Sequence, residues 1–244
     1  MAKAKEETGT AIATGITGKT TLATRAERVG QGSENVGMED RAVPRIKLIQ
    51  SISNEVQPGH PDLIEGAQAG MFFNSVNKQL FTSFFVINLS YDKNVVVWKK
   101  RKLGGGMFGT FQSEVEARTA LQEAGEPEEN FDISVNPFHL VLPIDPESGE
   151  PQSPAIMDFP GIKAKKSKLW NSLIAEAEAA GQPRFSTVWE ISSAGESNSE
   201  GNYMNIVIEK FIEAPDAIYD AAVKCYDWFY GEQAATAEQT EEAA

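Results

Sequence analysis

Cysteine and histidine, on which many catalytic and metal sites depend, are almost missing from this sequence. Cys225 is the single cysteine among 244 residues, which excludes an internal disulfide and a zinc site built from several cysteines. The two histidines, His60 and His139, stand in unrelated contexts, a Pro-rich turn and a strand, and we expect structural roles for them. The chain also lacks a Gly-x-Ser-x-Gly motif, a His-Glu-x-x-His motif and any acidic pair with a distinctive spacing. The sequence therefore predicts a protein without catalytic residues, metal or other cofactor.

Long apolar runs are missing as well. No segment approaches the roughly 20 apolar residues that span a bilayer. The charged start, Met1–Glu7, has no apolar core behind it and so differs from a secretory signal. We therefore expect a cytoplasmic protein with no membrane partner. Hydrophobic residues nevertheless make up 41% of the chain, and its length is sufficient for one large domain, or two small ones, with a buried core.

Acidic residues outnumber basic ones, and the formal net charge is −13. That excess argues against a typical nucleic-acid-binding domain, which is basic, but the distribution of charge changes this conclusion. Cations gather in residues 93–102 and 163–168, whereas acids gather in residues 114–132, 145–150 and the C-terminal segment. Local basic strips on an acidic body allow one polyanion to bind in one groove while other polyanions are repelled elsewhere.

The middle of the chain has the short alternating runs of a β-rich fold. Residues 1–40 are rich in Ala, Thr, Gly and charge, and we expect a flexible N-terminal arm there. The ordered domain follows it, with turns predicted at Asn77-Lys78 and Asp92–Asn94. The two strands at residues 185–191 and 203–212 flank the turn-rich residues 192–202 and should form a final hairpin. Strands are predicted at residues 43–49, 71–76, 81–91, 92–100, 138–142, 185–191 and 203–212.

Helices are expected between these strands and after them. We predict helices at residues 114–124, 163–180 and 215–230, with Pro215 at the favoured first-turn position of the last one. The segment 232–244 cannot bury a core and is expected to be a disordered acidic tail. A β-meander, a helix and a closing hairpin fit an OB-like β-barrel with an inserted helix. The predicted class is mostly β (α+β), with this domain and a C-terminal helix over residues 41–231.

A basic stretch and a glycine-rich loop follow one another in the middle of the chain. The cations come directly after the β-type run Val95–Trp98, and the loop Gly104–Gly106 leads to two aromatic residues. Cations attract phosphates, aromatic rings offer faces on which bases stack, and glycines let the backbone adapt to a strand of varying sequence. The alternative is a solvated strand end with a simple hairpin turn. The nucleic-acid-binding residues predicted here are Lys99, Lys100, Arg101, Lys102, Phe108 and Phe111.

A second basic strip opens the helix predicted at residues 163–180. The helix dipole disfavours cations at this end, so their presence indicates an anionic partner nearby. Trp170 follows the strip and either stacks on a base or packs in the core. The other tryptophans are expected to be structural, with Trp98 and Trp189 in core strands and Trp228 docking the terminal helix. The strip consists of Lys163, Lys165, Lys166 and Lys168.

The segment Gly15–Thr21 reads Gly-Ile-Thr-Gly-Lys-Thr-Thr and is close to a phosphate-binding loop. That loop needs a glycine five positions before the glycine of its Gly-Lys pair, and Ala13 stands there instead. No predicted strand precedes the segment and no clear helix follows it. We therefore expect a flexible Thr- and Gly-rich arm rather than a nucleotide site.

Several short stretches, in their order along the chain, carry a resemblance to a known family. They are residues 44–50, 65–70, 73–76, 97–101, 104–109, 165–171 and 183–185. Together they resemble a group of tailed-phage proteins associated with single-stranded-DNA binding. The layout is also similar to phage replication proteins that pair an OB-type barrel with an acidic C-terminal tail. The resemblance implies that the tail competes with DNA for the basic groove or recruits replication and recombination proteins. This chain departs from the pattern because it ends in Ala243-Ala244 without a terminal aromatic residue. The tail residues concerned are Glu232, Glu238, Glu241 and Glu242.

The sequence therefore predicts a single-stranded-DNA-binding protein of phage type, in the host cytoplasm, that coats strands exposed during replication, recombination or repair. Two other classes remain open. A virion structural or assembly protein would use the basic strips as contacts between subunits. A nuclease would need a carboxylate cluster that the sequence does not reveal. Homo-oligomer formation and the preference for DNA over RNA stay open too.

Overall fold

The computed structural model describes residues 31–36, 40–199 and 201–242, with side chains described as far as Gly231. The chain divides into two units, residues 1–42 and 43–244, and the strands and helices named below all belong to the second. Most of the predicted N-terminal arm and all of the Gly15–Thr21 segment lie outside the described residues.

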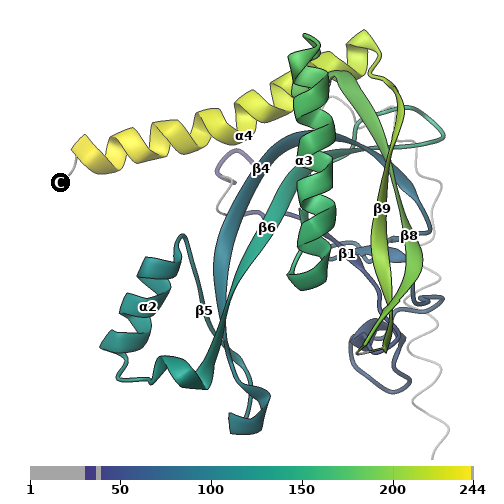
Figure 1. Cartoon of the computed structure of the whole chain (residues 1–244). Helices are drawn as coiled ribbons and strands as arrows, with labels where there is room; N and C mark the ends of the chain where they lie inside the picture. Colours follow the sequence, from purple (N-terminus) through teal and green to yellow (C-terminus); the bar gives the residue numbers. More distant parts are fainter. Residues whose placement is uncertain (1–30, 37–39, 200, 243–244) are drawn as a thin grey trace, which may run out of the picture. The chain divides into compact units, whose positions relative to one another are not determined.

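The second unit is built on one nine-stranded sheet, in which most neighbouring strands are antiparallel. Its order is β3-β2-β1-β7-β6-β4-β8-β9, with β5 paired to one end of β4, and β1 runs parallel to β7. Figure 1 shows the sheet curling around helix α3. The strands are β1 (Arg45–Leu48), β2 (Phe72–Asn74), β3 (Leu80–Phe81), β4 (Phe84–Lys99), β5 (Met107–Phe111), β6 (Phe131–Ile144), β7 (Ala155–Asp158), β8 (Thr187–Asn198) and β9 (Gly201–Glu213).

The C-terminal half of β4 and the N-terminal half of β6 pair with each other and extend away from α3 (Figure 1). Together with β5 and helix α2 (Glu114–Glu123) they form a projection that we call the arm. α2 begins where predicted, at an N-cap in which the Ser113 hydroxyl accepts a hydrogen bond from the Glu116 amide at 3.2 Å. The turn predicted at Asp92–Asn94 is wrong. Pairing with β6 occupies the backbone groups of these residues, so the chain continues as a strand.

Helix α3 (Ala164–Ala179) fills the concave side of the sheet and confirms the helix predicted at residues 163–180. Trp170 and Ile174 join the main core cluster, which includes Val86 of β4, Met157 of β7 and apolar residues of five other strands. Burying an apolar face of this kind is what stabilises a helix of ordinary propensity. α3 therefore holds a fixed position against the sheet.

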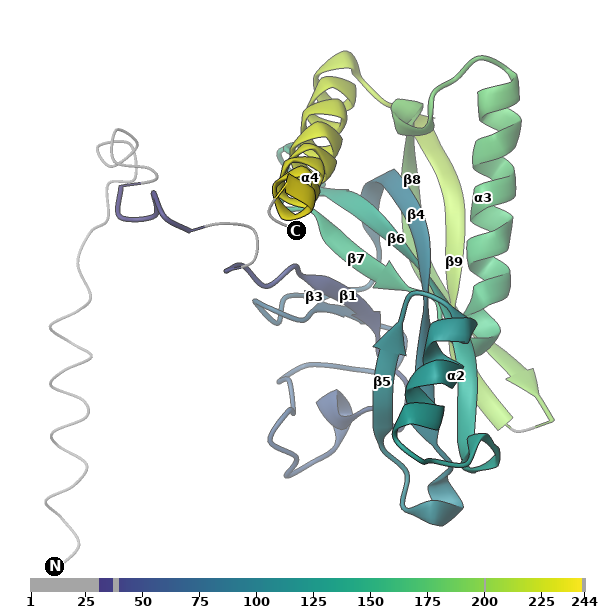
Figure 2. The ribbon, with the colours of Figure 1, turned by 90° about the vertical axis from the view of Figure 1, so that its left-hand side faces the viewer.

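Helix α4 (Asp216–Glu242) packs on the opposite, convex face, where Ile218 and Ala222 contact the cluster around Ile87 and Leu142. Figure 2 shows α3 and α4 on the two sides of the sheet. The helix predicted at residues 215–230 is longer than expected and continues as far as Glu242, into the segment that was predicted to be a disordered tail. Residues 232–242 consist mostly of Ala, Glu and Gln and contain neither proline nor glycine. These are strong helix formers, so a helix nucleated by the docked portion can propagate through them.

The mostly β, α+β class predicted from the sequence is confirmed. The OB-like barrel is not confirmed, because the pairings among the described strands give an open order that starts at β3 and ends at β9. Strands β1 and β9 approach each other without pairing. The contact is made by the side chain of Gln50, in the loop after β1, which bonds the backbone of Met204 in β9. In the described part of the chain no helix is long and apolar enough to cross a membrane.

Candidate nucleic-acid interface

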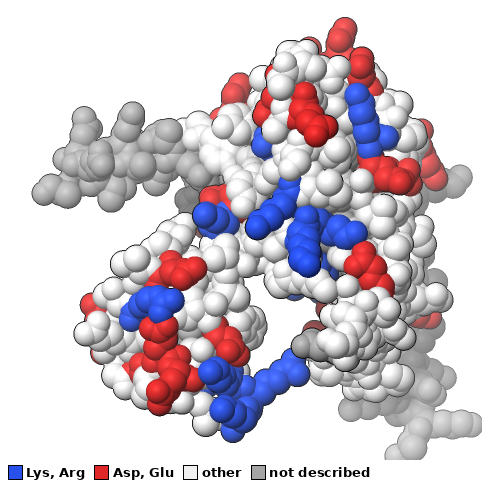
Figure 3. Space-filling view, viewed as in Figure 1, with Lys and Arg blue, Asp and Glu red and all other residues white. Residues whose placement is uncertain are grey.

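A groove of about 660 Å³ lies between the arm and strand β1. One wall consists of β4, β5 and β6 on the arm. The other consists of β1, the end of β7 and the short turn Gly161–Lys163 that leads into α3. Figure 3 shows the surface hollowed on this side, with Lys and Arg side chains at the lower end of α3 and at the free end of the arm.

The arm presents one face of an antiparallel ladder to the groove. Asn94 of β4 lies opposite Asn136 of β6, and Trp98 of β4 lies opposite Met107 of β5. Trp98 is 47% exposed and Met107 is 59% exposed. Side chains alternate along a strand, so the residues between these positions pack on the other face, beneath α2. The arm thus offers an exposed aromatic ring to the groove, with Met107 and polar side chains beside it.

The expectation that Trp98 belongs to the core is wrong. α2 covers only one face of the arm, so every second residue of the apolar run Val95–Trp98 is left facing the groove. Alternation within the run was the available signal, because Val95 and Val97 are buried while Val96 and Trp98 are not. Trp98 is the functional candidate that sequence reasoning missed.

The opposite wall is basic. Arg45 and Lys47 come from β1, and Lys163 comes from the turn before α3. Asp158 accepts a hydrogen bond from Arg45 Nη1 at 2.5 Å through one carboxylate oxygen and from Asn136 Nδ2 at 3.2 Å through the other. Burial lowers the pKa of the Lys163 ammonium, and the nearby Asp158 charge opposes that shift. One carboxylate thus stands among three cations, so the wall keeps an excess of positive charge.

Two cations of the first predicted strip are engaged within the arm. Lys99 lies 4.0 Å from a carboxylate oxygen of Glu126 and has its ammonium 5.8 Å from the centre of the Phe131 ring. Lys100 Nζ donates a hydrogen bond of 2.8 Å to the backbone oxygen of Glu129. Both side chains therefore fasten the end of β4 to the segment that precedes β6.

The other two cations of that strip are free to meet a ligand. Arg101 and Lys102 are exposed in a short 3₁₀ turn at the free end of the arm, and neither makes an ion pair within the described residues. The loop after them, Gly104–Gly106, has φ values of 102°, 68° and 104°. Residues with a side chain rarely adopt this left-handed region, which explains the three glycines.

Phe108 and Phe111 lie on the α2 side of the arm and not in the groove. Their rings stack with centroids 6.2 Å apart, and Phe108 also meets the Phe131 ring edge-on at 5.4 Å. Phe111 packs against the α2 cluster, while Phe108 is 36% exposed. The structure therefore separates these two aromatic residues from Trp98.

The second predicted strip lies where the groove meets α3. Lys163 lines the groove itself, and Lys165 and Lys168 are exposed on the first turns of the helix. Lys166 is paired with Glu196 of β8 at 3.0 Å. α3 has no side-chain cap on its first amides. The strip thus adds two exposed cations beside the groove, while a third cation holds the β8–β9 hairpin.

Trp170 is completely buried, so core packing, and not base stacking, is its role in this structure. Its ring lies 4.7 Å from the ring of His139, which is also fully buried. His139 Nδ1 accepts a hydrogen bond from Asn88 Nδ2 at 2.9 Å, so Nε2 carries the proton and donates to the Ser167 hydroxyl at 2.8 Å. Burial, reinforced by the Arg184 charge, lowers the pKa of His139 to about 3. The histidine is therefore a neutral core residue.

The remaining candidates are the tail glutamates, Glu232, Glu238, Glu241 and Glu242. They lie in the part of α4 whose side chains are not described, and their role stays a prediction. Among the residues that the structure describes, no three His, Cys, Asp or Glu side chains come together as a metal site would require.

The fold and the groove define a β-rich α+β protein with a basic groove that contains an exposed aromatic residue. The family model described as Pam3 phage gp34-like protein matches residues 13–235, and the chain belongs to this family of phage proteins. The resemblance to phage proteins is thereby confirmed at the level of a phage family. Neither a curated protein nor a solved structure matches the chain.

Proposed function

We propose that this protein binds single-stranded DNA, without catalysing a reaction on it, in the groove between the arm and β1. The observation that carries the proposal is the position of Trp98. Trp98 is 47% exposed on the sheet face that lines the groove, and the facing wall carries Arg45, Lys47 and Lys163. Binders of single strands combine such a stacking platform with a positively charged groove.

The two walls make different contacts with a strand. Phosphates lie along the basic wall, and a base stacks on Trp98 with the amide groups of Asn94 and Asn136 beside it. A duplex cannot use this arrangement, because its bases are already stacked on one another and face inward. The groove therefore selects a single strand by what it offers to the base rather than by charge alone.

Membership of a phage family supports the proposal, since phage replication and recombination expose single strands. Proteins of those processes are the partners that we propose for the acidic C-terminal segment. The rival function, an assembly protein of the virion, would use the same basic surface as a contact between subunits.

The test is fluorescence anisotropy with a labelled oligothymidylate at low and moderate salt, with duplex DNA as competitor. We expect binding that duplex DNA does not displace, with an affinity that falls linearly with salt concentration on logarithmic axes. Absence of binding at low salt, also in a variant without residues 232–244, would overturn the proposal and leave the assembly protein as the better account.

Two exposed tryptophans provide a matched pair of variants. Trp98→Ala removes the stacking ring and should weaken binding by about 1–3 kcal/mol. Trp228→Ala removes a ring that is 40% exposed on α4, away from the groove, and should leave binding unchanged. Quenching of intrinsic fluorescence by DNA should likewise be lost in Trp98→Phe and kept in Trp228→Phe. Equal behaviour of the two tryptophans would contradict the placement of the strand.

A further inference from the structure

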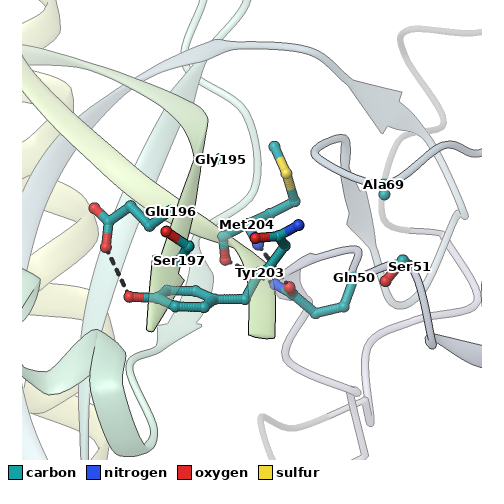
Figure 4. A pocket seen from close by; sticks show the side chains of 9 residues that line it. Gln50, Ser51, Ala69, Gly195, Glu196, Ser197, Tyr203 and Met204 are labelled. Atoms are coloured by element: carbon teal, nitrogen blue, oxygen red, sulfur yellow. Dashed lines mark hydrogen bonds between the residues drawn. The ribbon is translucent and has the colours of Figure 1, made fainter. Parts of the chain in front are cut away.

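A second cavity, of about 480 Å³, lies between the tip of the β8–β9 hairpin and the loop after β1. Figure 4 shows the ring of Tyr203 lying beside Ser197 and Met204 on the hairpin, with Ser51 and Ala69 on the other side. Small side chains on the far side leave space next to an aromatic ring. The cavity can therefore admit a flat, partly polar group.

A network of polar contacts fixes the ring of Tyr203. Its hydroxyl donates a hydrogen bond of 3.0 Å to Glu196 Oε2, which also accepts one of 2.7 Å from Asn205 Nδ2. The other carboxylate oxygen lies 3.0 Å from Lys166 Nζ. These contacts lower the pKa of Glu196 to about 2, so the carboxylate is ionised and fully paired. The one acidic group in the cavity is therefore neutralised by Lys166.

The same network connects this cavity with the groove. Lys166 stands on the first turn of α3, one helical turn after Lys163, which lines the groove. Exposed Lys165 and Lys168 belong to the same strip. Lys163 lines the groove and Lys166 is paired with Glu196 of the cavity, so the start of α3 borders both the groove with Trp98 and the cavity with Tyr203.

We propose that Tyr203 is a second base-stacking position, so that one strand contacts Trp98, crosses the lysine strip and places another base in the Tyr203 cavity. This inference rests on the proposed function and extends it. Ser51, Ser197 and Asn202 supply hydrogen-bonding groups around the ring, and the strip supplies charge for the phosphates between the two bases. Two stacking positions joined by a basic strip make the site longer than the groove alone.

The first experiment compares Tyr203→Leu with Tyr203→Phe. The phenylalanine variant keeps the ring and loses only the hydrogen bond to Glu196, so it controls for disturbance of the hairpin. With an oligothymidylate of about twenty nucleotides, longer than the roughly 4–16 nucleotides that one OB fold occupies, Tyr203→Leu should weaken binding about 5- to 100-fold. Tyr203→Phe should change the affinity less than about twofold.

The second experiment does not depend on affinity. An oligothymidylate carrying one 5-iodouracil is photo-cross-linked to the wild-type protein, and the attached residue is identified by mass spectrometry. Different positions of the iodouracil in the long oligonucleotide should label Trp98 and Tyr203 separately.

The outcomes separate this inference from the proposed function. Suppose that Trp98→Ala weakens binding, Tyr203→Leu does not, and Tyr203 is never labelled. The proposal of a second stacking position at Tyr203 is then wrong, and the proposal that the groove binds DNA is kept. Equal losses in Tyr203→Leu and Tyr203→Phe also overturn it, because the hairpin and not the ring would then matter. If the wild-type protein does not bind the oligonucleotide at all, both proposals fail.

Discussion

The side chain of Gln50 joins the loop after strand β1 to strand β9 through paired hydrogen bonds with the backbone of Met204. Gln50 Nε2 donates to the Met204 carbonyl at 2.9 Å, and Gln50 Oε1 accepts from the Met204 amide at 2.8 Å. Gln50 follows β1 and Met204 lies in β9, so an amide side chain makes here the two bonds that a neighbouring strand would make. The Ser193 hydroxyl adds a bond of 2.6 Å to the Gly70 carbonyl.

Replacing Gln50 with Ala should therefore destabilise the fold by about 1–3 kcal/mol, because it removes both bonds and leaves a half-buried peptide group unpaired. Urea unfolding measures this loss, and hydrogen exchange should show faster exchange of the Met204 amide. Gln57→Ala is the control, since Gln57 is exposed and makes one bond of 3.2 Å to the Ser51 carbonyl. Equal stability of the two variants would show that Gln50 does not stabilise the contact between the loop after β1 and β9.

Local signals predicted the secondary structure well where residues near in sequence decide it. The helices predicted at residues 114–124 and 163–180 and the hairpin strands predicted at residues 185–191 and 203–212 all correspond to elements that the structure contains. The arm was missed because its length depends on the pairing of β4 with β6, which are distant in sequence. The contact made by Gln50 could not be predicted either, since one glutamine after a strand has no distinctive pattern.

The candidate site was predicted in part. Lys163 proved to line the groove, and Arg101 and Lys102 proved to be exposed. Trp98 was expected in the core and is exposed, whereas Trp170, a stacking candidate, is buried, because the sequence shows that an aromatic residue is present but not which face of its element is covered. Trp170 lies on the face of α3 that packs against the sheet, and Trp98 lies on a sheet face that none of the described helices covers.

His139 should make the protein sensitive to acid. Its pKa of about 3 in the folded state is below the value of 6.5 expected for the unfolded chain, so the unfolded state takes up a proton first as the pH falls. The contribution of this group is fully present above pH 6.5 and decreases as the pH falls toward 3. Between pH 7 and pH 5 the loss is about 2 kcal/mol.

Urea unfolding at pH 7 and pH 5 tests this expectation. His139→Leu leaves Asn88 and Ser167 without their partner and is less stable at both values, but its loss between them should be about 2 kcal/mol smaller than that of the wild type. The carboxylates contribute equally to the loss of stability in both proteins, so the difference between the two losses reports on His139 alone. Equal losses of stability between pH 7 and pH 5 would contradict the assignment of a neutral buried histidine.

Arg101 and Lys102 should contribute to DNA binding without contributing to stability. Both are exposed at the end of the arm and make no ion pair in the described part of the chain. The double replacement with Ala should weaken binding and reduce the salt slope by up to about 1.4, about 0.7 for each phosphate of a single strand that is no longer neutralised. Lys210 and Lys224, exposed cations on β9 and α4, supply a control with the same change in charge. A loss of affinity equal to that of the control would show that only net charge matters.

Deletion of residues 232–244 should tighten DNA binding at low salt. The segment carries Glu232, Glu238, Glu241 and Glu242, and removing these charges removes an intramolecular competitor for the basic groove. The difference should vanish at high salt, where charges more than a few ångströms apart are screened. An unchanged affinity at low salt would assign the segment to partner binding alone.

Asp158 should act as an internal competitor for the phosphates. Its carboxylate bonds Arg45 and Asn136 and lies close to Lys163, so it occupies the place in the basic wall where a phosphate would bind. Asp158→Asn keeps the size of the side chain and removes the charge, which frees Arg45. The variant should bind oligothymidylate more tightly, and its salt slope should steepen by up to about 0.7 for one further neutralised phosphate. Asp227→Asn makes the same change in net charge on the exposed surface of α4 and should leave both quantities unchanged. If Asp158→Asn weakens binding instead, the carboxylate positions Arg45 for the ligand rather than competing with it.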